Sequence, residues 1–140
     1  MTDTPPVYGA PIALAAAKSI MEAAEAEARR NNWQVGIAIL DSGGNLVLFA
    51  RMENAPLASI EISQAKARTA LYFRRPTKVF QDAVAAGGLG VRMLTAPNMT
   101  AMEGGIPILS GGAVIGSIGV SGVQSHEDAQ IAEAGIKAVG

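Results

Sequence analysis

Hydrophobic positions along this chain change their period several times, and each change predicts a new element. From Pro11 to about Asn31 alanine dominates and charged residues recur at spacings of four, three and four, which is typical of an amphipathic helix. Those charged residues are Lys18, Glu22, Glu25 and Arg29. Proline fits the first turn of a helix, so we expect residues 1–10, which precede it, to form a flexible N-terminal arm.

Two pairs of short apolar segments predict two β-hairpins. Residues 33–40 are apolar on both faces, as expected for a central strand, and a glycine-containing turn leads from them into a second strand over residues 46–52. Residues 106–109 and 113–121 repeat this arrangement around Gly111 and Gly112. Because a hairpin joins antiparallel strands, the sequence predicts an antiparallel sheet.

Helical and irregular segments occupy the rest of the chain. The further predicted helices span residues 57–73, 77–86 and 125–139. Pro76 and the glycine pair at 87–88 end the first two of them, and residues 87–105 show no clear periodicity, so we expect one long irregular segment there. An antiparallel sheet with helices packed on it belongs to the α+β class.

Composition removes several classes of function. The chain has 140 residues, 49% of them hydrophobic, a net charge of −1 and no cysteine. Thiol catalysis, iron–sulfur clusters and thiolate-bound haem are therefore excluded, and without a basic patch we expect no nucleic-acid partner. No stretch reaches the roughly 18 apolar residues of a membrane span, and the start lacks a signal-peptide pattern, so we expect a cytoplasmic protein without membrane contact.

The lone histidine, His126, lies in a sequence that favours helix capping over chemistry. Ser125 precedes it and Asp128 follows, and this spacing resembles a capping box with Ser125 as the N-cap. One histidine without cysteine does not build an ordinary transition-metal site, so we predict no metal site.

The glycine pairs and methionines indicate structural more than chemical roles. None of the glycine pairs continues into a phosphate-binding loop or a dinucleotide fingerprint. The segment 116–122 comes closest, but inside a strand such glycines more often let a helix or a ligand approach the sheet. The methionines at 93, 99 and 102 suit core filling better than ligand binding, and no serine lies in a nucleophile elbow.

Three cations are the best candidates for holding a carboxylate. Arg51 ends the second strand, and Lys66 and Arg68 lie on the next helix, so they could converge on one ligand. The alternative is a solvated face, or ion pairs with Glu53 or Glu61.

Two sets of motifs resemble the GlcG/HbpS family of haem-degrading-domain (DUF336-type) proteins. The first set comprises residues 41–52 (DSGGNLVLFARM), 55–59 (APLAS) and 66–70 (KARTA). The second comprises residues 104–108 (GGIPI), 116–122 (GSIGVSG) and Asp128, so the resemblance covers about residues 12–139. It implies a single GlcG/HbpS-like domain over residues 11–140, with a profilin-like fold of about five antiparallel strands flanked by helices, in a symmetric homo-oligomer. The additional strand would come from residues 91–102.

The resemblance also implies a function and a set of ligand residues. We expect an accessory protein of catabolism or of redox and haem handling that binds haem or a small organic acid, with Arg51, Lys66, Thr69, Gly104 and Gly105 at the site. In haem-binding relatives a histidine of the first helix can ligate iron, but residues 22–27 contain none. The weak axial ligands that could replace it are Thr69, Tyr72, Met99 and Met102.

Two other functions stay open at this point. The chain could be an enzyme of the lyase or isomerase type in which Arg51 holds a carboxylated metabolite and Lys66 or Glu103 moves a proton. It could also be an oligomeric structural protein without a ligand, whose alanine- and glycine-rich faces serve subunit packing.

Overall fold

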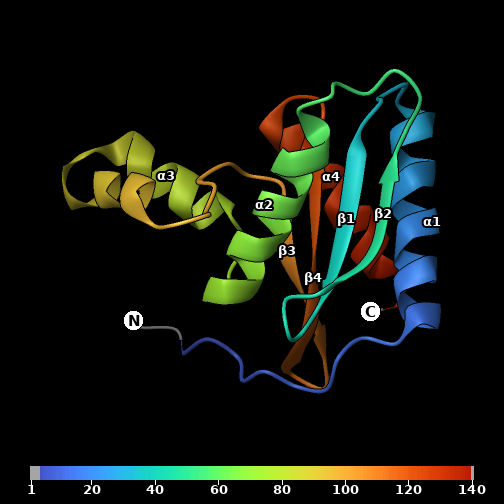
Figure 1. Cartoon of the computed structure of the whole chain (residues 1–140), viewed down its shortest axis with the longest axis horizontal. Coiled ribbons are helices and arrows are strands. Elements are labelled where there is room, and N and C mark those ends of the chain that lie inside the picture. The colour runs from blue at the N-terminus through green and yellow to red at the C-terminus, as the bar shows by residue number, and fades with distance from the viewer. Residues whose placement is uncertain (1–3, 140) are drawn as a thin grey trace.

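A four-stranded antiparallel sheet lies at the centre of the computed structural model, which describes residues 4–139 (Figure 1). The strands are β1 (Gly36–Asp41), β2 (Leu46–Arg51), β3 (Gly105–Ser110) and β4 (Ala113–Ser121). Their order is β2-β1-β4-β3, and every neighbouring pair is antiparallel. Both predicted hairpins and the central place of β1 are therefore confirmed.

Helices cover both faces of the sheet. On one face, Ile37 and Ile39 of β1 share a buried cluster with Ile20 of α1 (Leu14–Arg30) and Ile131 of α4 (Ser125–Lys137). On the other face, the intervening β1 residues Ala38 and Leu40 pack with Ala67 and Leu71 of α2 (Ser59–Phe73). Successive residues of a strand point to opposite faces, so this double burial explains why β1 is apolar throughout.

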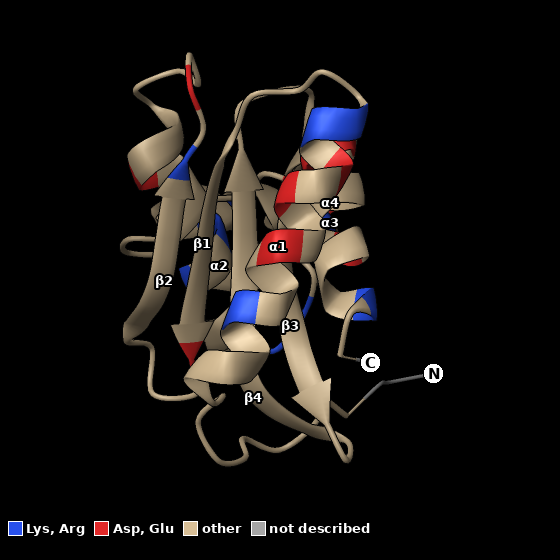
Figure 2. Cartoon of the chain, turned by 90° about the vertical axis from the view of Figure 1, so that its right-hand side faces the viewer, with Lys and Arg blue, Asp and Glu red and all other residues tan. Residues whose placement is uncertain are grey.

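The first helix carries its charges on the outside, as predicted. Figure 2 shows several blue and red positions along the ribbon of α1, whereas the strands behind it are almost entirely tan. The helix begins at Leu14 and not at Pro11, because the backbone before it is extended and Ile12 N donates to Ile115 O at 2.9 Å. Among the described residues, no helix is both long and apolar enough to cross a membrane.

Glycines of the sheet let α2 lie directly on the backbone. A Cβ atom built on Gly119 of β4 would lie 2.0 Å from Ser63 O and 2.5 Å from Ala67 N, and one on Gly105 of β3 would lie 2.3 Å from Lys66 O. Ser117, which like Gly119 lies on β4, donates a hydrogen bond from its Oγ to Ala67 O at 2.7 Å. The glycines of segment 116–122 thus serve helix packing, in agreement with the structural interpretation of that motif.

The α+β class is confirmed, but the expected fifth strand is not formed. Within residues 4–139 the segment from which it would come forms η1 (Gly88–Thr95), a 3₁₀ helix, followed by an irregular loop. η1 packs on α3 (Lys78–Ala86), and together they project from the sheet (Figure 1). Gly87 and Gly88, with φ angles of 77° and 63°, turn the chain back on α3, so residues 91–102 do not reach a sheet edge.

The N-terminal segment differs from the loose arm expected for residues 1–10. Residues 1–3 lie outside the described part of the chain. Further along, Gly9 N donates to Val114 O and Val114 N to Val7 O, each at 2.8 Å. The Tyr8 hydroxyl donates to Leu71 O at 2.8 Å. The described part of this segment is therefore held against β4 and the end of α2.

The glycine contact under α2 can be tested by adding one methyl group. Gly119→Ala should lower the free energy of unfolding by at least about 2 kcal/mol, because two backbone segments must separate to admit the Cβ atom. Chemical denaturation measures this difference. Gly43→Ala is the control, since its Cβ atom would mainly meet the flexible end of Asn45 at 3.1 Å. Equal stabilities of the two variants would contradict the close approach.

Candidate functional site

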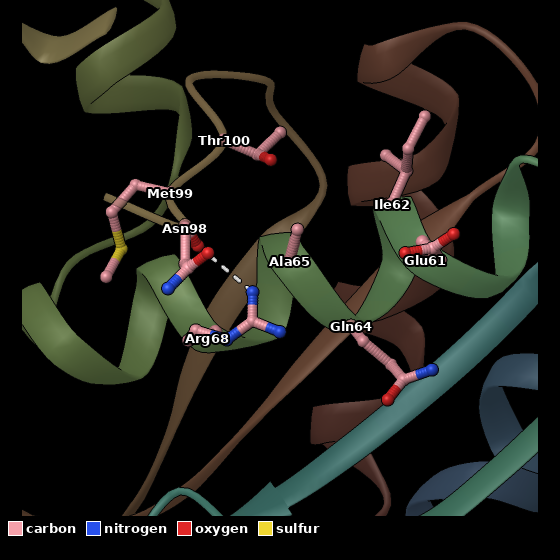
Figure 3. Close-up of a pocket in the computed structure, with 8 residues that line it drawn as sticks. All are labelled: Glu61, Ile62, Gln64, Ala65, Arg68, Asn98, Met99 and Thr100. Atoms are coloured by element: carbon pink, nitrogen blue, oxygen red, sulfur yellow. Dashed lines mark hydrogen bonds between the residues drawn. The ribbon is translucent and has the colours of Figure 1, made fainter. Parts of the chain in front are cut away.

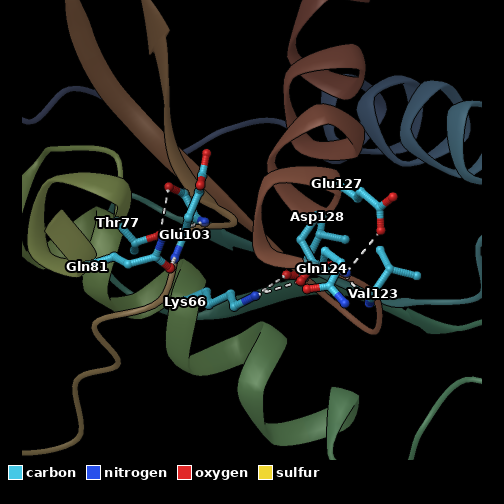
Figure 4. Close-up of polar contacts among 10 residues, drawn as sticks. Lys66, Thr77, Gln81, Glu103, Val123, Gln124, Glu127 and Asp128 are labelled. Carbon is cyan, nitrogen blue, oxygen red and sulfur yellow. Dashed lines mark hydrogen bonds and ion pairs between the residues drawn. The ribbon is translucent and has the colours of Figure 1, made fainter. Parts of the chain in front are cut away.

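A buried ion pair joins the helices on the two faces of the sheet. Lys66 Nζ of α2 donates to Asp128 Oδ2 of α4 at 2.8 Å and to Val120 O of β4 at 3.0 Å (Figure 4). Both side chains are 2% exposed. Asp128 Oδ1 also accepts a hydrogen bond from Val123 N at 3.2 Å. The pair is thus desolvated and supported by backbone groups on both sides, which is the arrangement that a buried ion pair requires.

The lysine reaches α4 through a gap at the beginning of β3. Gly104 lies there with a φ of 134°, a conformation that favours glycine. A Cβ atom on Gly104 would lie 2.8 Å from Lys66 Nζ and 3.0 Å from Asp128 Cβ. Hydrogen bonds from Val120 N to Gly104 O and from Gly105 N to Thr77 Oγ1 fix this backbone at 3.0 and 2.9 Å. Gly104 and Gly105 therefore make room for the ion pair and for α2.

Burial dominates the electrostatics of the aspartate. Desolvation raises the pKa of Asp128 to about 6, although the Lys66 ammonium and the Val123 N–H act to lower it. The folded protein therefore binds this proton more tightly than the unfolded chain, in which an aspartate has a pKa of about 3.9. The contribution of Asp128 to stability consequently falls as the pH rises from about 4 to about 6 and is constant above that range.

Removing one member of the pair should cost far more than removing both. Lys66→Met leaves the Asp128 carboxyl buried without its cation, so we expect a loss of about 3–5 kcal/mol in unfolding free energy at neutral pH. The double variant Lys66→Met/Asp128→Leu should recover most of that loss, because apolar side chains of similar volume can replace a buried pair. Denaturation of both single variants and the double variant measures the coupling. Additive losses would show that the two side chains do not interact.

The predicted capping role of Ser125 and Asp128 is wrong by one residue. The N-cap of α4 is Gln124, whose backbone N–H donates to Glu127 Oε1 at 3.1 Å. This shift turns Asp128 inward, toward Lys66. His126 lies exposed in the first turn of α4. Apart from its place in the second family motif, Asp128 carries no sequence signal for a buried role.

The three cations expected to converge lie apart. Arg51 is exposed and its Nη1 donates to Ala55 O at 3.2 Å, whereas the Lys66 ammonium is bound at β4. Arg51 belongs to β2, and the Lys66 ammonium is bound at β4. Strand β1 lies between these two strands, so their backbones are about two strand spacings, roughly 10 Å, apart. Arg68 leaves α2 in another direction and donates to Asn98 O at 3.0 Å.

Arg68 instead forms part of the wall of a surface pocket. This pocket has a volume of about 420 Å³ and lies between α2 and the loop that follows η1 (Figure 3). Its lining residues are Glu61, Ile62, Gln64, Ala65, Arg68, Asn98, Met99 and Thr100. The volume falls within the range of small-molecule sites. Sequence reasoning named Arg68 as a candidate for holding a carboxylate but assigned no ligand role to Asn98 or Thr100, because α2 and this loop meet only in the folded chain.

Thr69 positions the loop side of this pocket. Its buried hydroxyl accepts a hydrogen bond from Thr100 N at 2.9 Å and donates to Ala65 O at 2.8 Å. Of the four side chains considered as axial ligands, Met99 lines the pocket. Thr69 does not line it but holds the lining residue Thr100 through the hydrogen bond just described. Tyr72 and Met102 are exposed outside the lining.

The pocket lining holds one cation, Arg68, and one carboxylate, Glu61, and these two side chains form no ion pair with each other. Within the described residues Arg68 bonds a carbonyl and has no carboxylate partner. Its planar fork keeps further N–H donors for an incoming carboxylate. Ile62 and Ala65 add apolar surface beside it.

Glu103 and the two glycines lie at a second, smaller hollow. It has a volume of about 180 Å³ and is also bordered by Pro76, Lys78, Ile106, Ala129 and Glu133. Glu103 N donates to Gln81 Oε1 at 2.8 Å (Figure 4). The structure thus brings Glu103, Gly104 and Gly105 together, with Lys66 behind them, but it separates all four from Arg51.

These features define an α+β domain with helices on both faces of an antiparallel sheet and a pocket beside its central helix. The family model for haem degrading proteins of the HbpS-like type matches residues 12–137, so the chain belongs to the HbpS-like family. The GlcG/HbpS resemblance drawn from the motifs is therefore confirmed.

Individual relatives agree with this assignment. GlcG of Escherichia coli strain K12 is 45% identical over 106 residues, which are 75% of this chain and 77% of that protein. The crystal structure of HbpS matches with a TM-score of 0.86 and 28% sequence identity. The match covers 100% of this chain and 94% of that one. The crystal structure of a PduOC:haem complex has a TM-score of 0.84 and 26% identity, over 92% and 95% of the two chains.

Proposed function

We propose that this protein is a binding protein for a small ligand that carries a carboxylate, and that haem is the first candidate. The Arg68 guanidinium, in the wall of the 420 Å³ pocket and without a carboxylate partner among the described residues, carries the proposal. An arginine fork matches a carboxylate, so it can hold a haem propionate or a small organic acid. We infer an accessory role in haem handling or in the catabolism of such acids.

The chemistry of the lining residues suits haem in two further respects. Met99 offers a thioether, which can serve as an axial ligand to haem iron, and Thr100 offers a hydroxyl beside it. Ile62 and Ala65 provide apolar contact for a porphyrin ring. Haem bound here would supply a redox-active iron, while Arg68 would hold a propionate. The related PduOC:haem structure and the family description support haem over other carboxylates.

Titrations with hemin, iron-free protoporphyrin and glycolate separate the two kinds of ligand. We expect hemin to shift its Soret band on binding, and Arg68→Gln to weaken whichever carboxylate ligand binds by roughly 10- to 100-fold, because a charge-assisted hydrogen bond is lost. Met99→Leu should change the Soret spectrum of bound hemin while leaving protoporphyrin affinity within a factor of about three, since it removes only a candidate iron ligand.

Arg51→Gln is the matched control, because it removes an exposed arginine that does not line the pocket. It should bind all three probes as the parent protein does. Weakened binding in Arg51→Gln but not in Arg68→Gln would move the site to the first hairpin. If the parent protein binds neither hemin nor glycolate, the proposed function fails.

A further inference from the structure

The pocket beside α2 has charges of opposite sign at its two ends. Glu61 and Arg68 both line it, and the seven residues from one to the other make nearly two full turns of α2 (Figure 3). They therefore lie on the same side of the helix, with roughly 10 Å between their backbone positions. Figure 3 shows Ala65 between them, where the side chain is only a methyl group.

The Glu61 carboxylate is available to a ligand. It is exposed, and among residues 4–139 it forms no ion pair. Arg68, the cation of the same pocket, donates to Asn98 O at 3.0 Å instead. Glu61 also lies in the first turn of α2, where a carboxylate stabilises a helix. That stabilising role is independent of any ligand, so a ligand titration distinguishes it from a role in binding.

Gln64 adds an acceptor beside Glu61. It lies three residues, or about one turn, further along α2, and its Nε2 donates to Ile60 O at 2.9 Å. The amide nitrogen is thus engaged within the helix, and the amide oxygen is left as an acceptor for a ligand. Carboxylate and amide oxygens accept hydrogen bonds, whereas a guanidinium only donates them. One end of the pocket therefore suits a hydrogen-bond donor and the other end suits an anion.

We infer that Glu61 determines the specificity of this pocket: among carboxylate ligands it favours those with an ammonium or hydroxyl group at the other end over those with a second carboxylate. This inference rests on the proposed function, because it concerns the far end of the ligand that Arg68 holds. A second carboxylate would meet the like charge of Glu61 and be repelled. Discrimination then comes from repulsion of one ligand as well as from attraction of the other.

Ligands of moderate length fit this arrangement. The ends of an extended six-carbon chain are roughly 7–8 Å apart by ordinary bond lengths, which is within the roughly 10 Å between the two backbone positions. Ile62 and Ala65 offer apolar surface to the methylene groups of such a chain. Haem meets the same condition with one propionate at Arg68 and the other directed away from Glu61, so Glu61 would also restrict the orientation of haem.

Isothermal titration calorimetry of the full chain with 6-aminohexanoate, adipate and hexanoate tests the inference. The three probes share a chain length and one carboxylate and differ only at the other end. We expect the parent protein to bind 6-aminohexanoate roughly tenfold more tightly than adipate, and Glu61→Gln to bring the two affinities within a factor of about two. Hexanoate has no charged group at that end, so its affinity should be the same in the parent and in Glu61→Gln.

Charge reversal gives the sharper readout, and a second glutamate gives the control. Glu61→Lys should invert the preference, so that adipate binds roughly tenfold more tightly than 6-aminohexanoate. Glu22→Gln makes the same change in net charge as Glu61→Gln. Glu22 is also exposed and without an ion pair in the described part of the chain, but it lies on α1, across the sheet from α2. This variant should keep the preference of the parent protein.

An unchanged preference in both Glu61 variants, or the same loss of preference in Glu22→Gln, would overturn the inference. Equal binding of 6-aminohexanoate and adipate by the parent protein would also overturn it. If hexanoate still binds in that case and Arg68→Gln weakens its binding, the proposed carboxylate site stands and only the specificity assigned to Glu61 is wrong. Hexanoate binding that is unaffected by Arg68→Gln would instead contradict the proposed function, and the inference with it.

Discussion

The Lys66–Asp128 ion pair fixes how the two helical layers of this protein are placed. The lysine leaves α2 on one face of the sheet and ends on α4, which packs on the other face, with 2.8 Å between Nζ and Oδ2. Removing two charges from water costs several kcal/mol each, so this contact is tolerated only because backbone groups at Val120 and Val123 complete it. Its position is also specific, since Gly104 leaves a gap in which no other residue would fit.

Glycine contacts continue this constraint along α2. With backbone lying on Gly105 and Gly119, the helix has little freedom to slide or rotate on the sheet. Its inner face is thus occupied by Lys66, Ala67 and Thr69, and its outer face presents Arg68 to the pocket. The residues of the family motif at 66–70 therefore have separate roles: Lys66 links the two helical layers, Thr69 positions the loop, and Arg68 is the residue that we propose to bind a ligand.

The sequence predicted those parts of the fold that depend on local pattern. The two apolar faces of β1 and the glycine turns sufficed for the hairpins and for the α+β class. Lys66 and Asp128 are 62 residues apart, and charged residues are ordinarily solvated, so neither composition nor spacing could pair them. The fifth strand was expected from the family resemblance, whereas the glycine pair at 87–88 directs the chain into a 3₁₀ helix. The pocket was missed because its two walls meet only through the tertiary structure.

Carbon-13 NMR of the Asp128 side chain, followed as a function of pH, tests the buried ion pair most directly. The account predicts a carboxyl resonance that titrates near pH 6, because desolvation outweighs the attraction of the Lys66 ammonium. It also predicts that the Lys66 ammonium protons exchange slowly with water, since Nζ is bound to Asp128 and Val120 in the interior. A carboxyl that titrates near the ordinary value of about 3.9, together with rapidly exchanging Lys66 protons, would show that the pair is solvated and would contradict the account.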